Sequence, residues 1–96
     1  MTPQQFNESV QEGVVLVDFY SESCGPCRVL APILDQLANA TVLKINVSDA
    51  PEVSSEHGIS AVPTLEFYKN GQLQDTWLGL QSKDKLQNKF DALNAD

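Results

Sequence analysis

Cysteine, histidine and basic residues are scarce in this chain of 96 residues. It contains two cysteines and one histidine, and 6 lysines and arginines stand against 13 aspartates and glutamates, which gives a formal net charge of −7. A chain this acidic is not expected to bind nucleic-acid phosphates. Zinc normally takes four ligands, which two cysteines and one histidine do not supply, so no metal site is expected.

Long hydrophobic runs are also missing. No run approaches the roughly 20 residues that span a bilayer, so no membrane association is expected. The N-terminus, MTPQQF, lacks the basic region followed by an apolar one that marks a signal peptide. We therefore expect a cytoplasmic protein. In a reducing cytosol, a close pair of cysteines is more often catalytic or metal-binding than a structural cross-link.

The hydrophobic content of 42% is enough for one core, so residues 1–96 are expected to form a single domain. Hydrophobic patterning predicts an α/β protein with the element order α-β-α-β-α-β-β-α. The predicted strands are residues 14–20, 41–47, 64–69 and 72–79. The predicted helices start after Thr2, run from Pro26 to Asn39, run from Pro51 to near Gly58 with Ser48 or Asp49 as N-cap, and start after Ser82.

Asn70-Gly71 is a strong hairpin signal, because both positions of such a turn need positive φ. The hairpin predicts that the last strand is antiparallel, and the helical connections predict that the early strands are parallel. The sequence therefore predicts a four-stranded mixed sheet with helices on both faces.

The motif Cys24-Gly25-Pro26-Cys27 follows the apolar strand 14–20 and opens a helix, which is typical of a thiol–disulfide redox site. Unpaired N–H groups and the positive dipole end of the helix favour a thiolate at Cys24, so its pKa is expected to be lowered. Cys27 lies one turn deeper and is expected to be less exposed. The alternative is half of a zinc site, for which His57 is the only other soft ligand.

With these motifs, the chain resembles the thioredoxin family over nearly its whole length. The matching motifs occur in the family's order: Val17-Asp18-Phe19, Cys24-Gly25-Pro26-Cys27, Pro32, Lys44, Val62-Pro63-Thr64, Asn70-Gly71 and Gly79. The chain also departs from the family pattern. The family's first strand is lacking, and Tyr20 and Ser23 replace two family tryptophans.

The resemblance implies a thioredoxin-like fold and a protein-disulfide reductase that serves redox homeostasis without a bound cofactor. It implies that Cys24 attacks the target disulfide, that Cys27 then resolves the mixed disulfide, and that Asp18 and Lys44 assist this reaction. The implied substrate-binding residues are Gly25, Pro26, Ala61, Val62, Pro63 and Gly79, with a cis bond before Pro63. A monomer is expected, and the implied partners are a thioredoxin reductase that uses NADPH or ferredoxin, and targets such as ribonucleotide reductase, peroxiredoxins and methionine sulfoxide reductases.

Asp18 is the one charged residue of its strand. It is either a buried acid that exchanges a proton with Cys27, or a strand-end residue that reaches solvent or pairs with Lys44. The residues alone favour neither reading, and the resemblance favours the buried acid. Burial is expected to raise the Asp18 pKa, and the Lys44 ammonium is expected to temper that rise.

Two other functions compete with the reductase. Glutaredoxin-like use of glutathione is disfavoured by the Gly-Pro pair between the cysteines. A docking subunit would keep its role after Cys24→Ser, whereas a catalyst would not. Among the remaining residues, His57 is expected at the solvated surface and Trp77 in packing. Ser23 is either a neutral replacement or a more polar contact surface.

Overall fold

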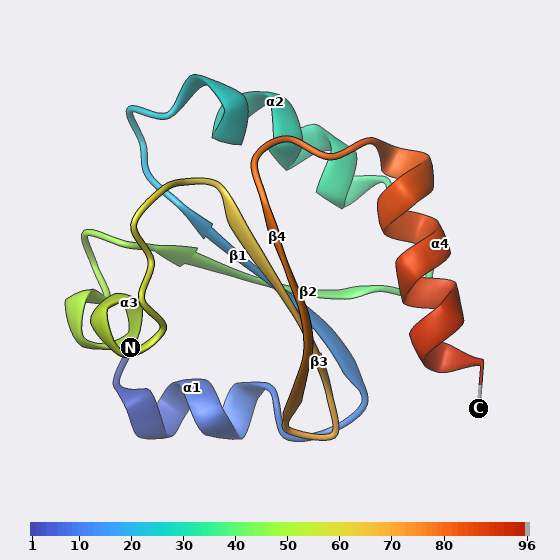
Figure 1. Ribbon diagram of the computed structural model, residues 1–96, viewed down its shortest axis with the longest axis horizontal. Coiled ribbons are helices and arrows are strands. Elements are labelled where there is room, and N and C mark those ends of the chain that lie inside the picture. The colour runs from blue at the N-terminus through green and yellow to red at the C-terminus, as the bar shows by residue number, and fades with distance from the viewer. Residues whose placement is uncertain (96) are drawn as a thin grey trace.

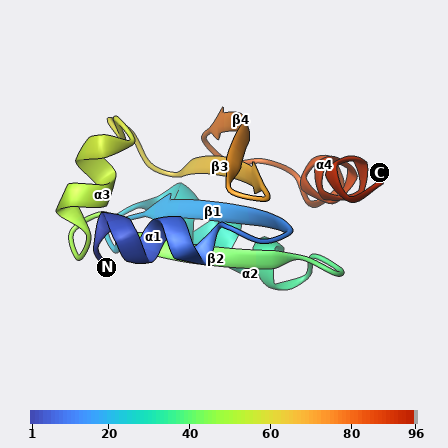
Figure 2. The same cartoon turned by 90° about the horizontal axis from the view of Figure 1, so that it is seen from below.

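The computed structural model describes residues 1–95, and four strands form one mixed sheet at its centre (Figure 1). The strands are β1 (Val14–Tyr20), β2 (Thr41–Asn46), β3 (Thr64–Lys69) and β4 (Gln72–Leu78). Their order across the sheet is β2-β1-β3-β4, and Figure 2 shows them stacked in this order. β1 is parallel to β2 and antiparallel to β3, and β3 is antiparallel to β4.

Two helices cover each face of the sheet (Figure 1). The helices are α1 (Pro3–Ser9), α2 (Gly25–Asp35), α3 (Pro51–Glu56) and α4 (Lys83–Asn94). α1 and α3 pack on one face, and α2 and α4 pack on the other. This arrangement confirms the predicted four-stranded mixed sheet flanked by helices.

β1 is buried along almost its whole length because both of its faces are covered. Alternate side chains of β1 enter two separate cores, so Val17 and Leu16, both fully buried, face opposite sides. The core under α1 and α3 contains Phe6, Val10, Val15, Val17, Phe19, Ile45, Ala50, Val53 and Tyr68. The core under α2 and α4 contains Val14, Leu16, Leu30, Leu34, Leu65, Phe67, Leu86 and Phe90. Trp77 packs against the second core, as predicted, with its ring 4.9 Å from that of Phe67.

The predicted caps of the first and last helices are confirmed. Thr2 and Gln5 form a capping box around Pro3, and the Ser82 hydroxyl accepts the Lys85 N–H. The cap predicted for α3 is wrong, because Ala50 occupies that position without a side-chain hydrogen bond. Ser48 and Asp49 lie in the preceding turn instead, where their N–H groups donate to Asn46.

Two further expectations are wrong in part. α2 ends at Asp35 rather than Asn39, and Asn39 has a φ of 55°, which no helix continues. The parallel direction holds for β1 and β2 but not for β3. The six-residue α3 lies at the end of the sheet where β1 and β2 finish, so the chain enters β3 from that end.

The β3–β4 turn is fastened to the segment that joins α1 to β1. The Asn70 side-chain oxygen accepts the Gly13 N–H at 2.9 Å, and the Asn70 N–H donates to the Gly13 carbonyl at 2.9 Å. The Gly71 N–H donates to the Val10 carbonyl at 3.0 Å. Both turn residues have positive φ, as the Asn-Gly signal predicts.

Candidate functional site

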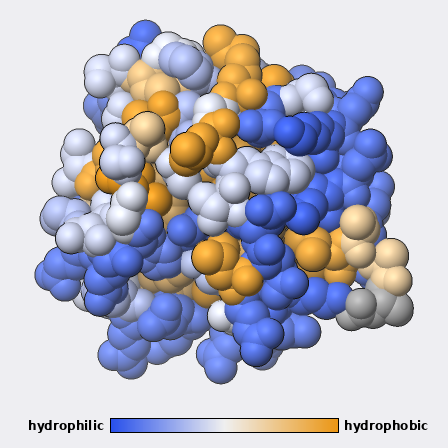
Figure 3. All heavy atoms as spheres, viewed as in Figure 1, coloured by the Kyte–Doolittle hydropathy of each residue, from blue (hydrophilic) through white to orange (hydrophobic). Residues whose placement is uncertain are grey.

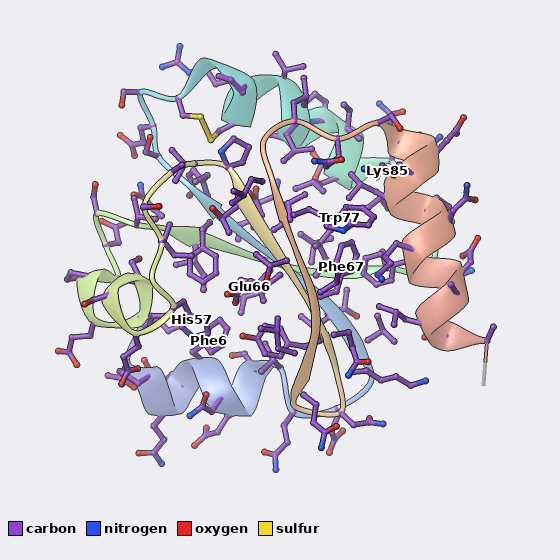
Figure 4. The ribbon with its side chains drawn as sticks, viewed as in Figure 1. Phe6, His57, Glu66, Phe67, Trp77 and Lys85 are labelled. Atoms are coloured by element: carbon purple, nitrogen blue, oxygen red, sulfur yellow. A yellow bond between two sulfur atoms is a disulfide. The ribbon has the colours of Figure 1, made fainter. Side chains whose placement is uncertain are left out.

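Cys24 and Cys27 form a disulfide at the start of α2, and their Cα atoms are 5.2 Å apart (Figure 4). Cys24 is the N-cap of this helix, and its Sγ accepts a hydrogen bond from the Cys27 N–H at 3.1 Å. Cys27 is buried, with 5% of its surface exposed, whereas Cys24 is partly exposed. A molecule that approaches the disulfide from solvent therefore meets Cys24 first.

The loop before β3 lies against this disulfide. The Val62–Pro63 peptide bond is cis, as the resemblance implies, and the Val62 carbonyl oxygen lies 3.7 Å from Cys24 Sγ. The Pro63 carbonyl accepts the Gly79 N–H at 2.9 Å. The Ala61 carbonyl accepts the Thr64 hydroxyl at 2.6 Å. These bonds hold the end of the loop in place beside Cys24.

Two exposed leucines flank Gly79, which is bonded to this loop. Leu78 is 67% exposed and Leu80 is 47% exposed. Figure 3 shows hydrophobic groups at several points on the face where β4 lies in front. Gly25 and Gly79 leave open space where a Cβ would stand. The sequence predicted the small residues near the cysteines but did not single out the two leucines.

Asp18 is a buried acid on the face of the sheet that α2 covers. Its exposed fraction is 2%, and its Oδ1 atom has no hydrogen-bond partner among residues 1–95. Burial raises the pKa of Asp18 to about 6, and the charge of Lys44 partly opposes that rise. The alternative of a strand-end aspartate that reaches solvent is therefore excluded. A carboxyl with this pKa exchanges protons readily near neutral pH.

Lys44 is the β2 residue opposite Asp18 in the parallel ladder. Its Nζ lies 3.4 Å from Asp35 Oδ1 at the end of α2, and its side chain is 40% exposed. Lys44 thus acts on Asp18 through its charge, while its ammonium is placed at the surface.

A surface cavity of about 270 Å³ borders Cys27, and the sequence did not predict it. Its remaining lining residues are Tyr20, Ser21, Glu22, Arg28 and Ala31. The Arg28 guanidinium donates to the Glu22 carbonyl oxygen at 2.7 Å, which ties the first turn of α2 to the preceding loop. The cavity is mostly apolar at its wall, so it suits an uncharged side chain beside the disulfide.

The prediction for His57 is wrong. Its side chain is only 18% exposed, and its Nδ1 lies 2.9 Å from Oε1 of the buried Glu66. Glu66 was not singled out from the sequence, although it shares a strand face with Tyr68 in an otherwise apolar segment. That pattern was the available signal for a buried polar group.

No helix within residues 1–95 combines the length and the apolar character that crossing a membrane requires. Among the same residues, no group of three or more His, Cys, Asp or Glu side chains is gathered in a way that could hold a metal ion.

Comparison with known proteins gives a consistent result. The family model named Thioredoxin matches residues 1–92. A thioredoxin of Rickettsia felis is 42% identical over 93 residues, which cover 90% of this chain and 89% of that relative. A thioredoxin of Chlamydia trachomatis is 36% identical over 90 residues and covers 90% of this chain and 88% of its own length.

Solved structures agree with these relatives. A mutant thioredoxin from Halobacterium salinarum superposes with a TM-score of 0.86 at 32% identity, covering 95% of this chain and 84% of its own. A thioredoxin from Malassezia sympodialis gives a TM-score of 0.84 at 30% identity, covering 97% of this chain and 88% of its own.

Proposed function

Since this chain belongs to the thioredoxin family and is a thiol–disulfide oxidoreductase, we propose that Cys24 and Cys27 carry out its reaction in fixed roles. The observation that carries this proposal is the unequal exposure of the two cysteines at the start of one helix. Cys24 is the partly exposed N-cap, and Cys27 is buried one turn further on.

In the proposed cycle, the Cys24 thiolate attacks one sulfur of a target disulfide. A bond forms between Cys24 and that sulfur, and the other target sulfur leaves as a thiolate. Cys27 then attacks Cys24 Sγ, which releases the second target thiolate and forms the Cys24–Cys27 disulfide. The target gains two electrons, the two cysteines lose them, and a reductase restores the dithiol.

Asp18 is proposed to take the proton from Cys27 as that thiol attacks. Its raised pKa of about 6 makes it a stronger base than an ordinary aspartate, and its position two residues after Leu16 in β1 places it on the face that α2 covers. Lys44 is proposed to keep a fraction of Asp18 ionised through its charge.

The neighbouring backbone is proposed to bind the target chain. Val62 would pair with an extended segment next to the target cysteine, as in β-strand addition. Gly25, Pro26, Ala61, Pro63 and Gly79 would form the surrounding surface, and their small size or fixed backbone leaves room for a second chain.

The family implies disulfide-containing targets and a reductase in general. We further propose a reductase that draws on NADPH or ferredoxin, and targets such as ribonucleotide reductase, peroxiredoxins and methionine sulfoxide reductases. A cytoplasmic location, a monomeric state and a single domain over residues 1–96 belong to the same proposal. The hydrophobic content of 42%, which is enough for one core, supports the single domain.

Reduction of insulin disulfides with dithiothreitol as electron source tests the proposal. Wild type is expected to speed insulin precipitation well above the dithiothreitol background, and Cys24→Ser is expected to fall to that background. Background rates for both proteins would contradict general reductase activity and favour the docking role. Wild-type rates in Cys24→Ser would contradict the assignment of the nucleophile.

A further inference from the structure

A buried polar cluster of His57, Glu66 and Tyr68 lies on the face of the sheet opposite Asp18. Nδ1 of His57 lies 2.9 and 3.1 Å from the two carboxylate oxygens of Glu66. The Tyr68 hydroxyl donates to Glu66 Oε1 at 2.8 Å and lies 3.3 Å from His57 Nδ1. Glu66 therefore accepts hydrogen bonds from two side chains, one on its own strand and one at the end of α3.

The surroundings of this cluster are apolar. Figure 4 shows Phe6, His57 and Glu66 close together between α1, α3 and β3. The His57 ring lies 4.5 Å from that of Phe6 in an edge-to-face contact and 5.5 Å from that of Phe19. Glu66 is only 4% exposed. A carboxylate in such a place is strongly destabilising unless donors satisfy it, so its bonds to His57 and Tyr68 constrain where His57 can lie.

His57 and Glu66 stand at the two ends of the loop that reaches the disulfide. His57 directly precedes residues 58–63, and Glu66 lies in β3, which follows them. The end of the loop is held by the bonds from Thr64 and Gly79, and its beginning by the Ile59 N–H donating to the Ser54 carbonyl. The bond from His57 to Glu66 closes this segment by joining the end of α3 to the strand.

We propose that His57 and Glu66 are positioning residues that hold residues 58–63 so that the Val62 backbone stands beside Cys24. The inference rests on the proposed function, because it concerns the binding of a target chain at Val62. Neither residue touches the reacting sulfurs, so their loss is expected to weaken target binding and leave the sulfur chemistry unchanged.

The test uses variants that separate the hydrogen bond from the packing. His57→Phe keeps an aromatic ring between Phe6 and Phe19 but removes the donor to Glu66, and is paired with Glu66→Leu so that no carboxylate is left buried alone. Glu66→Gln keeps an acceptor for both donors and serves as the conservative rescue. The paired variant loses the bonds that both His57 and Tyr68 make to Glu66, and its insulin KM is expected to rise on the order of three- to tenfold. The kcat of the paired variant is expected to stay within about twofold of the wild-type value. The KM of Glu66→Gln is expected to stay close to that of wild type.

Two measurements distinguish positioning from a general loss of structure. Alkylation of reduced Cys24 by iodoacetamide needs no docked target, so its rate is expected to match wild type in every variant. Amide hydrogen exchange is expected to quicken at residues 59–62 in the paired variant. The matched control is Phe67→Leu, which weakens the opposite core from the same strand and is expected to leave KM unchanged.

An unchanged KM in the paired variant, or an equal rise in Phe67→Leu, would overturn the positioning role while leaving the reductase intact. Failure of wild type itself to reduce insulin would overturn the proposed function, and the role in target binding with it.

Discussion

Asp18 and Lys44 lie opposite one another in the β1–β2 ladder, yet the Lys44 ammonium lies 3.4 Å from Asp35. The cation therefore acts on the buried acid from the surface and shares its charge with a second carboxylate. Because Coulomb interaction weakens with distance and solvent exposure, Lys44 lowers the Asp18 pKa without cancelling the effect of burial. Two predictions depend on this pair.

The first prediction concerns stability against pH. Folded Asp18 has a pKa of about 6, and an unfolded aspartate has one of about 3.9, so the folded chain holds a proton that the unfolded chain has lost. The proton held by folded Asp18 contributes up to about 3 kcal/mol to the free energy of unfolding. This contribution is complete below about pH 3.9 and is lost as the pH rises through about 6. Residue 18 cannot titrate in the Asp18→Asn variant. The free energy of unfolding of this variant, relative to that of wild type, is therefore expected to increase by up to this amount between about pH 3.5 and pH 7.5.

Urea unfolding of the oxidised proteins across this pH range gives the measurement. Asp84→Asn is the control, because Asp84 is exposed on α4 and does not belong to the group formed by Asp18, Lys44 and Asp35. Parallel stability curves for wild type and Asp18→Asn would show that Asp18 titrates as an ordinary surface carboxyl.

The second prediction concerns Lys44. Lys44→Gln removes the charge that opposes burial, so the pKa of Asp18 is expected to rise above about 6. Lys44→Arg keeps the charge and is expected to leave the Asp18 titration nearly unchanged. Carbon NMR of the Asp18 carboxyl measures the titration midpoint in both variants and in wild type. A lower midpoint in Lys44→Gln would mean that Lys44 does not act on Asp18 through its charge.

The third prediction concerns the two sulfurs. In Cys27→Ser, the partly exposed Cys24 can still attack a target, but no second thiol is present to release the target from Cys24. This variant is expected to accumulate a mixed disulfide with a reducible target, and Cys24→Ser is not. Mass spectrometry of alkylated, non-reduced samples detects the adduct. Equal adduct formation by both variants would contradict the assigned roles.

The fourth prediction concerns the core under α4. Phe90 is 1% exposed and packs its ring 5.9 Å from that of Phe67. Phe90→Ala is expected to lower the free energy of unfolding by about 3–5 kcal/mol, through lost burial and the cavity left behind. Leu73→Ala is the control, since Leu73 is 51% exposed and is expected to change stability by less than about 1 kcal/mol. Urea denaturation measures both, and similar losses would mean that α4 is loosely packed.

The sequence predicted the features that depend on neighbouring residues. The strand that carries Asp18, the helix that Cys24 caps and the turn at Asn70 each have a local pattern that was sufficient. The cis bond before Pro63 came from the resemblance alone, because the local residues favour the trans form.

The features that were missed depend on distant contacts. His57 is polar and follows a short helix, so its pattern suits the surface, and only the fold brings Glu66 to it. The direction of β3 depends on where α3 lies relative to the sheet, which helix length alone does not settle. The early end of α2 was missed because residues 36–39 contain no glycine or proline to mark the end of a helix.

The bonds from Asn70 and Gly71 to Val10 and Gly13 also limit when the N-terminal segment can reach its final structure during synthesis. The partners of the segment after α1 are synthesised 57 residues later than Gly13 itself. A nascent chain that has emerged only through α3 therefore lacks the turn that fastens the segment after α1. The N-terminal segment is therefore synthesised early, but it gains these bonds only when Asn70 and Gly71 have been made and β4 and α4 are still to follow.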